Sequence, residues 1–187
     1  MKKYSLVLLL IGGFLFLGYV FYHNNFTDEG ILENVIERDG YILERKNDKE
    51  TVKLYIKPEW IPFNDTKEHD LDIELARENN TGIILDEVWN REIDIYFSFD
   101  TTYDLNFTRG SFMYNGIFNE DGTYTTNSSY WDYSIYNLNN EKVDFGQSGQ
   151  GPNSTFGFAI EPENYDLIRD GFYVEYSGFY LYEYNKK

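Results

Sequence analysis

The sequence predicts a mainly β protein: an antiparallel, immunoglobulin-like or fibronectin-type β-sandwich preceded by one N-terminal transmembrane helix, with a jelly roll as the alternative architecture. Three observations predict this fold. The chain has 18 tyrosines and 15 phenylalanines but alanine only at Ala76 and Ala159, and this composition favours strands over helices. From residue 51 onward, apolar residues recur with a period of two, which is typical of half-buried strands. A long uncharged run lies near the start of the chain, from Tyr4 to Tyr22.

The first 25 residues have the layout of an export signal. Lys2 and Lys3 precede an uncharged run from Tyr4 to Tyr22, which is close to the roughly 20 residues that span a bilayer as a helix. No Ala-x-Ala-like cleavage site follows the run. We therefore expect residues 1–25 to be a retained signal-anchor; the alternative is a signal peptide whose cleavage releases a secreted domain. The positive-inside rule places the N-terminus in the cytoplasm and the C-terminal domain outside it.

Residues 26–50 are expected to form a juxtamembrane spacer. Apolar residues recur at helical spacing from Ile31 to Ile36, with Asp28 as a possible cap and Gly40 just past the end, which favours a short helix. In the alternative interpretation, a turn at Gly40 begins a hairpin. The charged stretch KNDKE, residues 46–50, predicts a solvated turn in either case.

Residues 51–187 carry the predicted extracytoplasmic sandwich. Six stretches alternate apolar with other residues, and polar turn sequences separate them. They are TVKLYIK (51–57), DLDIELA (70–76), EIDIYFSF (92–99), SFMYNGIF (111–118), STFGFAI (154–160) and GFYVEY (171–176). After the last stretch the apolar phase changes at Ser177-Gly178, which predicts a bulge or a tight turn there.

The stretch NSSYWDYSIYNLNN, residues 127–140, contains four aromatic rings within seven residues. In a strand, successive side chains point to opposite faces. We therefore expect Trp131, Tyr133 and Ile135 on the core face, and Tyr130 and Tyr136 on the outer face with an acid and a hydroxyl between them. The outer pair contacts a ligand only if neighbouring strands place other rings beside it.

Net charge and composition exclude several classes of function. The formal net charge of −16 repels phosphate backbones, so we expect no nucleic-acid partner. The absence of cysteine excludes disulfides, thiolate metal sites and cysteine nucleophiles. No G-x-S-x-G motif accompanies the two histidines, His23 and His69, so no serine triad is indicated.

The candidate metal ligands are Asp65, Glu68 and Asp70, which lie close together in the acidic stretch NDTKEHDLD. Calcium prefers several oxygen ligands that converge, so calcium is the one cofactor that we consider; otherwise none is expected. The alternative interpretation is a charged outer face on an edge strand, which prevents edge-to-edge aggregation.

Exposed aromatic rings are the strongest indication of function, because Tyr and Trp are enriched at contact surfaces. The candidate ligand-binding residues are Tyr130, Tyr136, Trp60 and Trp89. We expect a membrane-anchored, extracytoplasmic binding module without catalytic activity, whose partner is an envelope polysaccharide or a membrane protein. One alternative is a carbohydrate or wall-polymer hydrolase that uses two carboxylates; another is a calcium-stabilised structural module.

Overall fold

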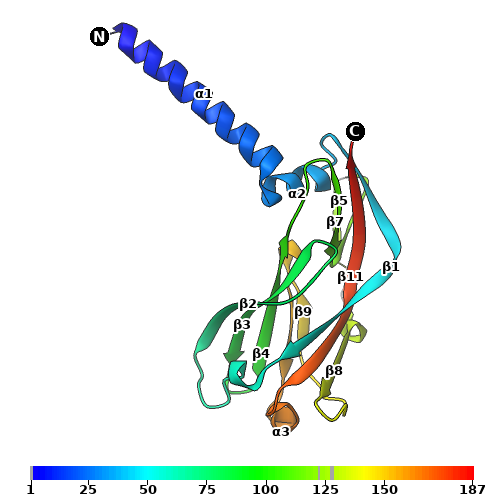
Figure 1. Ribbon diagram of the computed structural model, residues 1–187. Coiled ribbons are helices and arrows are strands. Elements are labelled where there is room, and N and C mark those ends of the chain that lie inside the picture. Colours follow the sequence, from blue (N-terminus) through cyan, green and yellow to red (C-terminus); the bar gives the residue numbers. More distant parts are fainter. Residues whose placement is uncertain (1, 122, 127–128) are drawn as a thin grey trace.

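The computed structural model describes residues 2–121, 123–126 and 129–187, with the backbone alone described at residues 2–8 and 47. In Figure 1, α1 lies outside a body made almost entirely of strands. The elements are α1 (Lys2–Phe26), α2 (Asp28–Ile36), β1 (Tyr41–Ile56), η1 (Pro58–Trp60), β2 (Glu68–Glu78), β3 (Thr81–Asn90), β4 (Ile95–Tyr103), β5 (Arg109–Tyr114), β6 (Gly116–Phe118), β7 (Tyr124–Thr126), η2 (Tyr130–Asp132), β8 (Tyr133–Asn137), β9 (Ser148–Gln150), η3 (Pro152–Ser154), β10 (Phe156–Ile160), η4 (Pro162–Asn164), α3 (Tyr165–Ile168) and β11 (Phe172–Lys186).

The strands form two larger antiparallel sheets and a small hairpin of β6 and β7 (Figure 1). In the first sheet, β11 lies between β1 on one side and both β5 and β8 on the other; the second sheet has the order β2-β3-β4-β10-β9. The prediction of a mainly β, antiparallel fold is confirmed, and the arrangement is consistent with a β-sandwich. Three sequential strands lie side by side in the second sheet, unlike the A-B-E-D order of immunoglobulin constant domains.

The main core lies between the two sheets and follows from alternation along the strands. Leu54 and Ile56 of β1 are fully buried, as predicted. Phe156 of β10 stacks on Tyr176 of β11 with ring centroids 4.1 Å apart, so aromatic packing joins one sheet to the other. Burial raises the pKa of the Tyr176 hydroxyl, which accepts a hydrogen bond from the side-chain amide of Gln150.

The central strand β11 changes face once along its length. Tyr176 pairs with Val52 and Phe179 pairs with Glu50, so β11 has one more residue than β1 between these two pairs. This register shift confirms the bulge that the sequence predicts at Ser177-Gly178. Because side chains alternate with a period of two, the extra residue exchanges the two faces of β11 beyond this point.

A second, smaller core lies on the opposite face of the first sheet. Beyond the bulge, Tyr180, Tyr182 and Tyr184 point to this face, and they pack in one cluster with Ile31 and Val35 of α2. The hydroxyls of Tyr182 and Tyr184 each donate to a backbone carbonyl oxygen, at 2.9 and 2.8 Å. Buried tyrosines are tolerated here because these hydroxyls have hydrogen-bond partners.

Residues 26–50 contain a helix and the start of a strand. The helical interpretation is confirmed by α2, but the capping residue is Thr27, whose hydroxyl accepts a hydrogen bond from the Gly30 amide at 3.2 Å. The prediction of a turn at residues 46–50 is wrong, because β1 continues through them. Pairing with β11 continues on both sides of this segment, with register shifts between Arg45 and Lys49 and between Glu50 and Val52.

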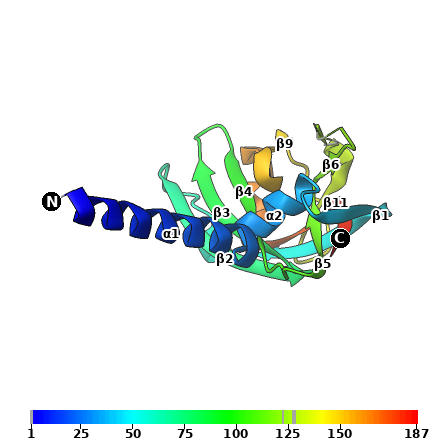
Figure 2. The same cartoon turned by 90° about the horizontal axis from the view of Figure 1, so that it is seen from above.

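Helix α1 projects from the body, as the view in Figure 2 also shows. Its large apolar side chains are largely exposed; Leu9 and Phe14, for example, are 72% and 76% exposed. Among the residues that the structure describes, no helix reaches the combined length and hydropathy of a membrane span.

Contacts with α2 and with the segment between β4 and β5 join α1 to the body. The side-chain amide of Asn34 donates to the Asn24 carbonyl oxygen at 2.7 Å. Gly30 lies so close to α1 that a Cβ atom at this position would be 2.2 Å from the His23 carbonyl oxygen. Phe26, the last residue of α1, stacks on Phe107 with ring centroids 5.9 Å apart. The helix is therefore attached through packed contacts at its end.

The bulge allows a direct test of packing. We expect Gly178→Ala to lower the free energy of unfolding by about 1–3 kcal/mol, the usual effect of overpacking. A Cβ atom at Gly178 would lie 2.2 Å from the Tyr176 hydroxyl oxygen, and Tyr176 is fully buried against Phe156. The measurement is urea denaturation of the full chain in detergent solution.

Gly149→Ala is the matched control for this experiment. No atom lies within 4 Å of a Cβ added at Gly149, so we expect a change of no more than about 0.5 kcal/mol. Equal effects of the two substitutions would contradict the packing proposed at the bulge.

Candidate functional site

Three tyrosines form a row across the outer face of the first sheet. Tyr55 of β1 pairs with Tyr173 of β11, and Tyr173 pairs with Tyr136 of β8. All three side chains are half-buried. The ring centroids of Tyr55 and Tyr173 are 5.0 Å apart, with the ring planes tilted by 38°. We call these three residues the tyrosine row.

Alternation along three strands places these rings outside the core. Each tyrosine has a neighbour in its own strand that belongs to a parallel row: Leu54 beside Tyr55, Val174 beside Tyr173 and Ile135 beside Tyr136. These three neighbours also pair with one another across the strands. All three are fully buried in the main core. Neighbouring residues of a strand point to opposite faces, so the tyrosines point away from the core.

Charged groups lie beside the tyrosine row. The Lys53 ammonium is 5.1 Å from the ring centroid of Tyr173 and 3.1 Å from the Glu175 carboxylate. Lys142 forms an isolated backbone bridge with Tyr136, which extends the row by one position. The surface thus combines flat rings with charged hydrogen-bonding groups.

The hydroxyl groups of the row are available to a ligand. Within the described part of the chain, no hydrogen bond joins the hydroxyls of Tyr55, Tyr136 or Tyr173 to another protein group. In contrast, the hydroxyl of Tyr133 on the core side of β8 donates to the Gly149 carbonyl oxygen at 3.1 Å. The three hydroxyls therefore retain their capacity to donate and accept hydrogen bonds.

Of the two tyrosines expected on the outer side of β8, only Tyr136 lies in the row. Tyr130 is 45% exposed but belongs to the 3-10 helix η2. Its ring stacks on Phe145 with centroids 4.3 Å apart, and its hydroxyl donates to the Phe145 carbonyl oxygen at 3.2 Å. Tyr130 is therefore engaged with the loop that follows β8.

The prediction that Trp131 lies on the core face is wrong, because its side chain is 82% exposed. The strand begins only at Tyr133, and η2 interrupts the alternation just before it. A capping box between Ser129 and Asp132 holds η2, and Asp132 also pairs with the Lys49 ammonium at 2.7 Å. Asp132 is therefore buried, although it was expected on the outer face.

The two predicted tryptophans lie on other elements. Trp60 in η1 is half-buried against the main core, with the Lys57 ammonium 5.0 Å from its ring centroid. Trp89 on β3 is 37% exposed, and its indole N–H donates to the Thr66 carbonyl oxygen at 3.1 Å. No ring contact between the described residues joins either tryptophan to the tyrosine row.

Sequence reasoning did not select Tyr55 and Tyr173, which make up most of the row. The alternation in TVKLYIK and GFYVEY does place them opposite the predicted core residues, and this signal was available. Tyr55 and Tyr173 are close in space because the first strand pairs with the last one, although these two residues are 118 positions apart in the sequence. No pattern in a single sequence reports such a pairing.

The candidate metal ligands do not converge on one point. Asp65 pairs with His69, with 3.3 Å between the carboxylate oxygen and Nε2, while Glu68 and Asp70 are exposed on β2. A backbone hydrogen bond from Lys67 lowers the pKa of Asp65. Among the described residues, no group of three or more His, Cys, Asp or Glu side chains is placed to hold a metal ion.

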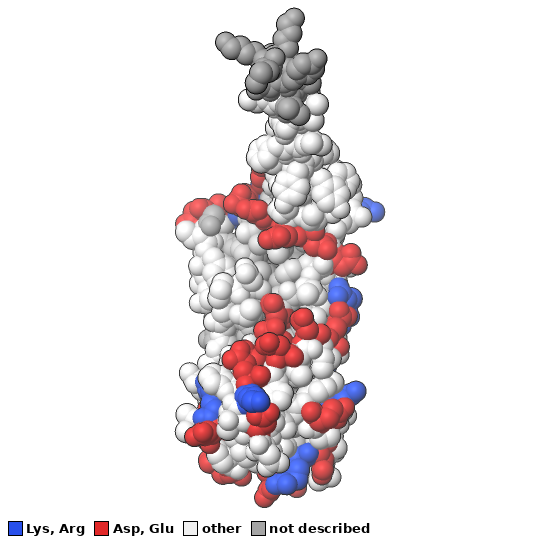
Figure 3. Space-filling model, turned by 90° about the vertical axis from the view of Figure 1, so that its left-hand side faces the viewer, with Lys and Arg blue, Asp and Glu red and all other residues white. Residues whose placement is uncertain are grey.

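The outer face of the second sheet is strongly acidic, as the red side chains over β2–β4 in Figure 3 show. The pKa of Asp86 is raised, first by burial and then by the nearby carboxylates of Asp100, Asp72 and Asp70. Burial and the neighbouring Glu68 likewise raise the pKa of Glu87. The two outer faces of the protein therefore differ: one carries tyrosines with lysines, and the other carries carboxylates.

Comparison with known proteins yields no family model, no curated protein and no solved structure that matches this chain.

The acidic face predicts a pH-dependent stability. Because the folded state raises the pKa of Asp86, ionised Asp86 destabilises the fold above that pKa, and the effect disappears as the pH falls through it. We expect Asp86→Asn to be more stable than the native chain at pH 7, with a difference that shrinks towards about pH 4, near the ordinary pKa of Asp.

Urea denaturation between pH 7 and pH 4 measures this difference. Glu163→Gln, at an exposed position in η4, is the control and should leave the stability unchanged. A loss of stability in Asp86→Asn at pH 7 would contradict the proposed repulsion.

Proposed function

We propose that this protein is a membrane-anchored, extracytoplasmic binding module that binds an envelope polysaccharide at the tyrosine row. The row itself is the observation that carries the proposal: Tyr55, Tyr173 and Tyr136 occupy adjacent positions on three paired strands. A sugar ring has an apolar C–H face and a rim of hydroxyls. It therefore matches an aromatic ring that is flanked by hydrogen-bonding groups.

The dimensions of the row favour a thin polymer chain. Neighbouring strands lie about 4.8 Å apart, so three tyrosines and the adjoining Lys142 form a narrow track across the sheet. A stable protein partner buries about 800 Å² on each side, around a hydrophobic centre. Three half-buried rings with Lys53 and Glu175 beside them fit a chain of sugars better than such an interface.

The anchor is supported by the sequence of α1 and by its exposed side chains. The run from Tyr4 to Tyr22 has no charged residue, and Lys2 and Lys3 precede it. From Leu9 to Phe26, large apolar side chains face solvent around the helix. Inserting this surface into a bilayer removes it from water, which is strongly favourable. The positive-inside rule then places the β-domain on the outer side.

Binding to the row is tested with Tyr173, the middle ring. We expect Tyr173→Ala to weaken retention on isolated envelope polysaccharide about tenfold or more, because the aromatic surface is lost. Tyr173→Phe keeps the ring and should retain most of the binding. The measurement is a pull-down of the detergent-solubilised full chain on insoluble polysaccharide, with depletion from the supernatant quantified.

Trp131→Ala provides the matched control, since Trp131 is the more exposed ring but lies outside the row. Equal binding by the native chain and Tyr173→Ala would overturn the role of the row. Retention by detergent-solubilised membrane proteins in place of polysaccharide would assign the row to a protein partner.

The anchor is tested by substituting within α1. We expect the native chain to remain in membranes after an alkaline wash, and a protease added outside the cytoplasmic membrane to remove the β-domain. Leu15→Arg places a charge in the middle of the apolar run, which costs about 2.5–3.5 kcal/mol in insertion, so it should release part of the protein.

Leu138→Arg, an exposed position in the β-domain, is the control and should leave the membrane fraction unchanged. Full protection of the β-domain by an intact cytoplasmic membrane would contradict the proposed orientation. The carboxylate-dependent hydrolase and the calcium-stabilised module stay predictions from the sequence.

A further inference from the structure

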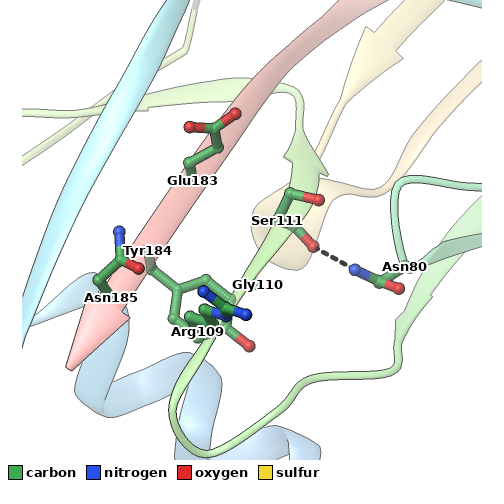
Figure 4. Close-up of a pocket in the computed structure, with 7 residues that line it drawn as sticks. All are labelled: Asn80, Arg109, Gly110, Ser111, Glu183, Tyr184 and Asn185. Carbon is green, nitrogen blue, oxygen red and sulfur yellow. Dashed lines mark hydrogen bonds between the residues drawn. The ribbon is translucent and has the colours of Figure 1, made fainter.

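A polar groove of about 390 Å³ lies where β5, β11 and the β2–β3 turn meet. Figure 4 shows its lining side chains, with those of β5 and β11 on adjacent strands and the turn at one side. The lining residues are Asn80, Arg109, Gly110, Ser111, Glu183, Tyr184 and Asn185. This is a separate place from the tyrosine row, so the inference drawn from it does not rest on the proposed polysaccharide binding.

The bulge in β11 puts the groove and the tyrosine row on opposite faces of the first sheet. Beyond the bulge, Phe179 and Leu181 pack against the main core, and Glu183 and Asn185 follow them in alternation. The groove also lies near the end of α1. Phe107 stacks on Phe26, and Arg109 follows Phe107 by two residues, at most about 7 Å along the chain.

Arg109 is the arginine whose guanidinium has no protein partner among the described residues. It makes no ion pair, hydrogen bond or ring contact there. Each of the other arginines has such a partner: Arg38 the Asn119 carbonyl oxygen, Arg45 the Tyr180 ring, Arg77 Glu74, Arg91 Asp94 and Arg169 Asp166. All the N–H donors of the Arg109 guanidinium therefore remain available to an external anion.

The other residues that line the groove supply further hydrogen-bonding groups. The Asn80 side chain is held in place because its amide donates to the Ser111 carbonyl oxygen at 3.1 Å, as the dashed line in Figure 4 marks. The side chains of Ser111 and Asn185 add a hydroxyl and a carboxamide to the lining. The carboxylate in the groove, Glu183, pairs with the Lys46 ammonium at 2.7 Å, so most of its repulsion of an anion is compensated.

We propose that this groove binds a phosphate ester, with Arg109 as the main ligand-binding residue. The guanidinium fork can bind two phosphate oxygens, and the additional hydroxyl and carboxamide groups can bind either the third terminal oxygen of a monoester or the hydroxyls of the esterified alcohol. The groove is also larger than one phosphate group, which leaves space for the esterified alcohol. A lipid headgroup and a soluble phosphate ester share this chemistry.

The experiment uses the full chain in dodecyl maltoside micelles, which contain no phosphate. In one arm, glycerol 3-phosphate is titrated calorimetrically. In the other, phosphatidylglycerol is added to the micelles and the retained lipids are counted by native mass spectrometry. We expect Arg109→Gln to weaken binding about tenfold or more, as for loss of a charge-assisted bidentate contact, and Arg109→Lys to have an intermediate effect because it keeps only the charge.

Two variants serve as controls. Arg169→Gln removes an exposed arginine that follows α3 and pairs with Asp166 in that helix, and this variant should bind as the native chain does. Glu183→Gln removes the negative charge from the groove and should tighten binding. Arg109 is exposed, so its replacement should leave the thermal unfolding midpoint unchanged.

The two arms identify the source of the phosphate. Arg109-dependent retention of lipid supports a headgroup as the ligand, and Arg109-dependent binding of glycerol 3-phosphate alone supports a soluble ester. Binding in neither arm, or binding that Arg109→Gln leaves unchanged, overturns the proposal.

Discussion

The extra residue at Ser177-Gly178 is the constraint on which the other surfaces of this protein depend. β11 is the central strand of its sheet, and it contributes to both hydrophobic cores. With unbroken alternation, Tyr176, Tyr180 and Tyr184 would all point to the same face of the sheet. The bulge exchanges its faces once, so Tyr176 fills the space between the sheets while Tyr180 packs beneath α2 on the other side.

This exchange also decides which side chains remain available for ligands. The face that carries Tyr180, Tyr182 and Tyr184 is covered by α2 and the neighbouring loops. The same face continues past the bulge to Tyr173, where no such cover exists and the tyrosine row forms. The opposite face of the first sheet packs against the second sheet, which ends at the turn that contains Asn80. The end of the first sheet that is left uncovered there forms the groove with Arg109. Both surfaces are therefore the ends of faces whose remainder is buried.

Local patterns in the sequence predicted the parts of the fold that depend on neighbouring residues. Alternation identified the buried sides of the strands, the phase change identified the bulge, and helical spacing identified α2. The prediction was wrong at Trp131, which lies in the short 3-10 helix η2 just before β8 begins. Alternation alone does not show where a strand begins. Of the candidate site, only Tyr136 was predicted, since the pairing that brings Tyr55 and Tyr173 beside it is a long-range contact.

The attachment of α1 relates the two surfaces to the proposed membrane. The close approach of Gly30 to α1 and the stacking of Phe26 on Phe107 join α1 to the β-domain. The groove lies at the α1 end of β11, whereas Tyr55 lies 14 residues of β1 beyond Tyr41, or roughly 45 Å at the usual rise of a strand. An anchor in the bilayer would thus hold Arg109 near the headgroups and the tyrosine row far from them. The fold thus places the groove and the tyrosine row far apart, so that the two proposed ligands would be bound at different distances from the proposed anchor.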